Sequence, residues 1–88
     1  MDIFLVSYEF LGNDYYTDLI PIAAYKTYDS AFKCMNEYAN DVKQGTFYNL
    51  EDIRGYDITN RDNYTVTLYS EERNNTIRFI IQKLQLKD

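Results

Sequence analysis

Alternating apolar and polar positions begin the chain and predict a β-hairpin. Residues 3–10 place Phe4, Val6, Tyr8 and Phe10 on one face, while Ser7 and Glu9 make the other face increasingly polar, which is the period of a half-buried strand. The segment 11–14 contains glycine and asparagine, which tolerate positive φ, so it predicts a turn. Residues 15–26 predict the second strand. Pro21 has no N–H to donate, so it predicts an edge position or a bulge in that strand.

After the hairpin, apolar residues recur at helical spacing and predict one helix. Thr27 or Asp29 is the expected N-cap, and Gly45 is the expected terminator, with a lysine just before it that favours the helix dipole. Apolar residues three and four positions apart form one stripe that would lie against a sheet. That stripe consists of Ala31, Met35, Tyr38, Ala39 and Val42.

Three more strands are expected after the helix, at residues 56–59, 64–69 and 76–86. In the last of them, Leu84 has the opposite parity to the earlier apolar residues, which predicts a bulge near Gln82 and the following lysine. The order ββαβββ with short loops predicts an α+β fold, an antiparallel sheet of four to five strands with one helix packed on one face. A chain of 88 residues is the size of a single domain, 1–88.

The charge of the chain is unevenly distributed. The formal net charge is −5, and residues 1–52 hold nine acidic side chains and three lysines, whereas residues 53–88 hold five acidic and six basic ones. A field of this sign repels phosphates, so we expect no direct nucleic-acid binding and a partner with a basic surface. One cysteine, no export signal and no apolar run of membrane-spanning length favour a cytoplasmic protein without membrane attachment.

The residues needed for common catalytic chemistry are missing. The sequence has no histidine, so it offers no imidazole base and no typical zinc site. Its three glycines are isolated and form no phosphate-binding loop. Cys34 lies in the predicted helix beside the apolar stripe and is interpreted as a packed thiol. We therefore expect a protein that is not an enzyme and that uses no cofactor and no metal.

The remaining candidate is an interaction surface rich in acids and tyrosines. Ten tyrosines are more aromatic rings than a thin core can bury together with five phenylalanines, so several are expected at the surface. Acids interleaved with tyrosines can bind arginine-rich surfaces through charge and cation–π contacts. The candidate partner-binding residues come from the first turn, the exposed helix face and the segment after the helix: Asp14, Tyr15, Tyr16, Asp18, Glu37, Asp41, Tyr48, Glu51 and Asp52.

The hairpin and the following run Ala24–Phe32 resemble small phage and mobile-element proteins of AT-rich bacteria, in which a hairpin strand leads into a T/S-x-x-x-A helix start. The short, acidic, tyrosine-rich profile is similar to that of phage-encoded inhibitors of host defence, anti-CRISPR proteins among them. This resemblance implies an inhibitor in the host cytoplasm that binds a basic, nucleic-acid-handling surface of a host protein, such as a nuclease or a CRISPR effector. No motif matches position by position, so the resemblance implies no residue roles.

Two other hypotheses belong to different classes of protein. The first is a homo-oligomeric structural or assembly module, for example a homodimer formed through an unpaired edge of strand 76–86. The second is a small-ligand-binding regulator, for which the sequence offers no recognisable site.

Overall fold

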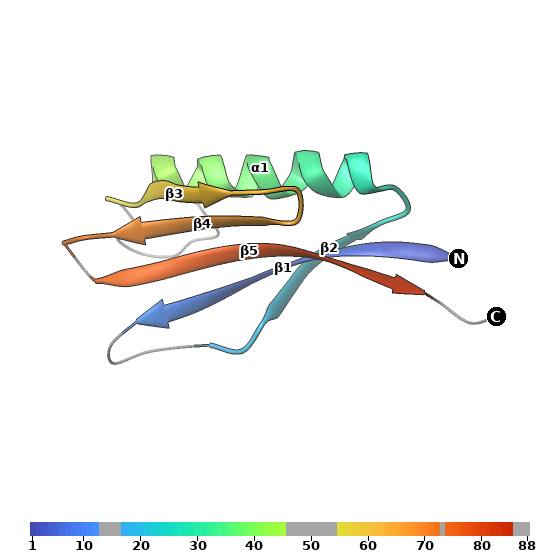
Figure 1. Ribbon diagram of the computed structural model, residues 1–88, viewed down its shortest axis with the longest axis horizontal. Coiled ribbons are helices and arrows are strands. Elements are labelled where there is room, and N and C mark those ends of the chain that lie inside the picture. The colour runs from blue at the N-terminus through green and yellow to red at the C-terminus, as the bar shows by residue number, and fades with distance from the viewer. Residues whose placement is uncertain (13–16, 46–54, 73, 86–88) are drawn as a thin grey trace.

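Five strands and one helix make up the described part of the chain in the computed structural model, residues 1–12, 17–45, 55–72 and 74–85 (Figure 1). This arrangement confirms the predicted α+β class and the order ββαβββ. The elements are β1 (Asp2–Gly12), β2 (Ile20–Tyr25), α1 (Tyr28–Gln44), β3 (Asp57–Arg61), β4 (Thr65–Ser70) and β5 (Asn75–Gln85).

The five strands form one antiparallel sheet in the order β2-β1-β5-β4-β3. The first and last strands of the chain therefore lie side by side, and their ladder runs unbroken from Asp2↔Gln85 to Gly12↔Asn75. The bulge predicted near Gln82 is thus wrong, and Leu84 simply lies on the face opposite to α1. The expected edge along strand 76–86 is also wrong for most of its length, because β5 is paired with β1 on one side and with β4 on the other.

The edge strands are β2 and β3, and both are irregular. The β1–β2 register shifts where Val6 is opposite Ala23 and Ser7 is opposite Pro21. Pro21 therefore lies in an edge strand next to a bulge, which confirms the interpretation of this proline. The β3–β4 register shifts between Ile58 and Asn60. Short, bulged edges of this kind are poor templates for pairing with further strands.

Helix α1 has a cap at each end. The side chain of Thr27, the N-cap residue, accepts a hydrogen bond from the Ser30 backbone N–H at 3.2 Å. At the other end Gly45 has φ 79° and donates its N–H to the Val42 carbonyl oxygen at 3.0 Å, which closes the helix in the left-handed conformation that glycine favours. No helix in the described ranges is long and apolar enough to cross a membrane.

Helix α1 carries the chain from one edge strand, β2, across the sheet to the other edge strand, β3. It contacts all five strands on one face. The core lies between that face and the predicted apolar stripe of the helix. Its buried members are Val6, Ala31, Cys34, Met35, Ala39, Val42, Tyr56, Val66, Leu68, Ile77, Phe79 and Ile81.

Candidate functional site

Five separate segments of the chain meet at one end of the sheet. At this end β1 finishes with Gly12 opposite Asn75, the first residue of β5. The turn between β4 and β5 lies next to them, because Ser70 is also opposite Asn75. The start of β3 lies there too, since Asp57 is opposite Tyr69. Residues 17–19, before β2, lie beside the end of β1, because the Thr17 N–H donates to the Phe10 carbonyl oxygen, and the C-terminus of α1 lies at this end as well (Figure 1).

These segments give that end of the molecule a strongly acidic character. Among the described residues, its charged side chains are Asp18, Asp41, Asp57, Glu71 and Glu72, with Lys43 as the single basic one. We call these five carboxylates the acidic end. Charges are balanced elsewhere in the described ranges: Glu9 pairs with Arg78, and Asp2 lies 3.6 Å from Lys83. The net negative charge of the described residues therefore resides at this end.

A hollow of about 530 Å³ lies within the acidic end, between the start of β3 and the β4–β5 turn. Asp57, Glu71 and Glu72 line it together with Tyr69. The Tyr69 hydroxyl donates a hydrogen bond to Asn74 Oδ1 at 2.8 Å, which fixes the position of the ring. Glu71 and Glu72 are exposed, so their carboxylates meet solvent beside an aromatic side chain. This combination suits a cationic side chain of a partner, because carboxylates and an aromatic ring both attract positive charge.

Three of the sequence-predicted site residues fall in the described ranges, and the structure separates them. Asp18 is exposed and Asp41 is half-buried, and both belong to the acidic end. Glu37 is exposed one helical turn before Asp41, on the polar face of the helix, as predicted. The other six lie outside the described residues: Asp14, Tyr15, Tyr16, Tyr48, Glu51 and Asp52.

The structure also adds residues that were not among the candidates. Asp57, Tyr69, Glu71 and Glu72 come from the half of the chain with a slight basic excess, so the acidic surface is not confined to residues 1–52. A usable signal was present, because the adjacent Glu71 and Glu72 occupy a turn, and turns are exposed. The sequence did not predict the strand order, which places this turn beside the end of the first strand.

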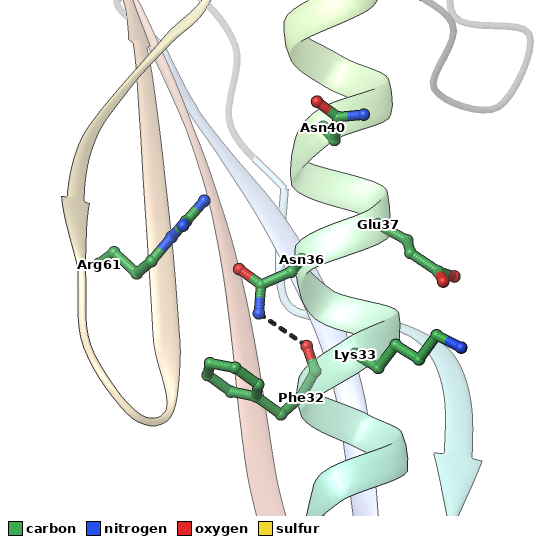
Figure 2. A pocket seen from close by; sticks show the side chains of 6 residues that line it. All are labelled: Phe32, Lys33, Asn36, Glu37, Asn40 and Arg61. Carbon is green, nitrogen blue, oxygen red and sulfur yellow. Dashed lines mark hydrogen bonds between the residues drawn. The ribbon is translucent and has the colours of Figure 1, made fainter.

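A second hollow, of about 580 Å³, lies between α1 and the edge strand β3 (Figure 2). Phe32, Asn36 and Arg61 face one another across it, whereas Lys33 and Glu37 point away from Arg61. Asn36 Nδ2 donates to the Phe32 carbonyl oxygen at 2.8 Å, and the amide oxygen of Asn36 is buried without a hydrogen-bond partner. The lining of the hollow thus combines one aromatic ring with amide and charged side chains.

The thiol of Cys34 is the one nucleophile that the sequence analysis singled out. Its side chain is 6% exposed and belongs to the core, which confirms the interpretation as a packed thiol. Burial raises the pKa of this thiol, so the reactive thiolate is disfavoured. Within the described part of the chain, no three acidic or cysteine side chains are grouped so that they could hold a metal ion.

Comparisons with family models, with curated proteins and with solved structures gave no match to this chain. The resemblance to phage-encoded inhibitors therefore stays a prediction.

Proposed function

We propose that this protein is a non-catalytic inhibitor of the phage type, which binds a basic, nucleic-acid-handling surface of a host defence protein through its acidic end. The observation that supports this proposal is the charge distribution. Asp18, Asp41, Asp57, Glu71 and Glu72 come from four separate segments and gather at one end, where Lys43 is the only described base. A surface that attracts nucleic-acid phosphates is basic, so an acidic end of this kind is complementary to it.

The hollow around Tyr69 gives the acidic end a feature that a basic partner can recognise. An arginine side chain that enters it would meet the carboxylates of Asp57, Glu71 and Glu72 and the face or edge of an aromatic ring. Exposed ion pairs contribute only about 0.2–1 kcal/mol each. The acids therefore act mainly by steering the partner and orienting it, and their effect decreases as salt screens the charges.

The same charge argues against other partners. A phosphate backbone or an anionic lipid surface is repelled by the acidic end, so the proposal involves neither direct nucleic-acid binding nor membrane binding. The proposed inhibitor occupies the place of nucleic acid on its target and works in the host cytoplasm without a cofactor.

The proposal is tested by affinity capture from a host lysate, with the bound proteins identified by mass spectrometry at low and at high salt. A triple variant, Asp57→Asn, Glu71→Gln and Glu72→Gln, removes the charges around the hollow with little change in shape. A double control variant, Asp2→Asn and Asp29→Asn, removes two exposed charges at the opposite end.

We expect the unmodified protein and the double variant to retain a nucleic-acid-handling protein at low salt and to release it at high salt. The triple variant should retain at least tenfold less of that protein. If all three forms retain it equally, or if retention does not depend on salt, the acidic end is not the binding surface.

A further inference from the structure

The face of the sheet opposite to α1 carries an apolar patch. Side chains alternate along each strand, so the residues of β1 and β5 that do not face the helix lie on this open face. Ile3 is directly opposite Leu84, and Ser7 is directly opposite Ile80. β2 adds Pro21 and Ala24 beside them, opposite Ser7 and Leu5. We call this set the open-face patch, which consists of Ile3, Leu5, Pro21, Ala24, Ile80 and Leu84.

The open-face patch is accessible to a partner. Leu84 is 44% exposed, Pro21 and Ala24 are exposed, and Ile3, Leu5 and Ile80 are half-buried. None of the six packs against the core on the helix side. An antiparallel sheet covered on one face only normally has polar side chains on the other. Contiguous apolar side chains at this position instead indicate an interaction surface.

The open-face patch carries no net charge, so its partner differs from the basic partner expected at the acidic end. On the open face, β1 and β5 contribute two charged side chains, Glu9 and Arg78, and these pair with each other. The patch itself is uncharged, so it offers nothing to attract a basic protein. It also lies toward the end of the sheet where Asp2 is opposite Gln85, away from the acidic end.

We infer that the open-face patch binds a second copy of this chain, so that two sheets pack face to face around a two-fold axis perpendicular to the strands. Two identical uncharged apolar patches are complementary without any matching of charge. Because each patch lies away from the acidic end, this axis directs the two acidic ends in opposite directions. The net charge of −5 on each copy then opposes association least.

The size of the open face sets the strength of the contact. Strands are about 4.8 Å apart and rise about 3.3 Å per residue, and β1 and β5 have eleven residues each whereas β2 and β4 have six each, so these four strands project roughly 540 Å². Two copies would therefore bury about 1,100 Å² in total, less than a standard interface and in the range of weak, reversible contacts. The area includes threonine and glutamine side chains around the patch, so we expect a dimer with a micromolar dissociation constant.

A dimer of this form has a consequence for binding. It presents one acidic end at each extremity, so a target with two basic sites, or two targets, can be engaged at once. Occupancy of a second site then strengthens the overall attachment without any new contact.

Sedimentation equilibrium of the full chain, from low micromolar to near-millimolar concentration, tests the inference. The unmodified protein should shift from the monomer mass to the dimer mass. Leu84→Lys places a charge in each copy of the patch and should weaken association by at least tenfold. Leu19→Lys is the control, because Leu19 is 37% exposed and does not belong to the patch. It should leave the dimer intact.

The remaining outcomes are equally decisive. A monomer at every concentration overturns the inference, and so does an equal dimer for Leu84→Lys and the unmodified protein. Loss of the dimer in the Leu19 variant as well would place the contact elsewhere. High salt should leave the dimer unchanged or strengthen it, because the contact is apolar, and a dimer that dissociates in salt would contradict the proposed surface. Far-UV circular dichroism of both variants excludes unfolding as the cause.

Discussion

Phe79 offers the sharpest test of how the core stabilises this sheet. It is the largest of the fully buried side chains and lies on central strand β5. Its ring stacks on Tyr38 of the helix, with centroids 6.3 Å apart and planes at 12°. A second ring, Tyr8 of β1, lies 6.1 Å away. Replacement of Phe79 by alanine therefore removes contacts that join the helix to the two longest strands.

The expected loss can be compared with the whole stability. Phe→Ala substitutions in cores cost about 3–5 kcal/mol. Aromatic pairs contribute about 0.5–1.5 kcal/mol beyond area burial, so two such pairs place Phe79→Ala near the top of that range. A chain of 88 residues has a free energy of unfolding of roughly 4–13 kcal/mol at about 0.05–0.15 kcal/mol per residue. The alanine variant should thus lose a third or more of its stability.

Urea denaturation followed by far-UV circular dichroism measures this loss. With an m-value of about 1 kcal/mol/M, Phe79→Ala should lower the midpoint by about 4 M or leave the protein unfolded in buffer. Phe79→Leu keeps an apolar side chain and loses the ring contacts, so its midpoint should decrease by only about 1–2 M. The exposed control Leu19→Ala should change the free energy of unfolding by about 0.5 kcal/mol or less. A decrease below about 1 M for Phe79→Ala would refute this account of the core.

Two further predictions concern the helix end and the β3–β4 turn. Gly45→Ala forces a residue with a Cβ into the left-handed conformation at φ 79°, so it should lower the free energy of unfolding by about 1 kcal/mol in urea denaturation. Gly12 has no positive φ, so Gly12→Ala should lower the free energy of unfolding by less. Equal losses for the two variants would contradict this account. Asp62 accepts hydrogen bonds from the Tyr64 and Thr65 backbone N–H groups and the Thr65 hydroxyl, which lower its pKa. Its ionised form therefore stabilises the folded state above the unfolded pKa of about 3.9, and this stability is lost as pH decreases through the lower folded pKa. The stability difference between the unmodified protein and Asp62→Ala should decrease over that acidic range, and a difference independent of pH would contradict this role.

Local signals were enough to predict the elements. The helix is bounded by Thr27 and Gly45 because a side-chain oxygen at the N-cap and a glycine at the C-cap satisfy backbone groups within a few residues of themselves. Pro21 likewise indicated an edge position or a bulge, since the missing N–H is a property of that one residue. Such features act within a few residues of the chain, so they can be predicted directly from the sequence.

Leu84 shows where a local pattern was misleading. Its position in the alternating pattern predicts a bulge near Gln82 only if all apolar side chains of the last strand face the helix. The unbroken register with β1 shows that Leu84 instead lies opposite Ile3 on the open face. The pattern of a single strand cannot distinguish a slip in register from a second apolar face, because both place the side chain on the opposite parity.

Part of the proposed binding surface could be predicted and part could not. Composition determined an acidic chain without histidine, and the predicted hairpin and polar helix face indicated Asp18 and Asp41 as candidates. Only the tertiary structure placed Glu71 and Glu72 beside Asp57, and only the sheet order brought these acids to the end of the molecule where Asp18 lies. The physical reason is that strand pairing joins residues far apart in the chain. Hydrogen bonds between β1 and β5 decide which turns become neighbours, and no local property of either turn encodes that choice.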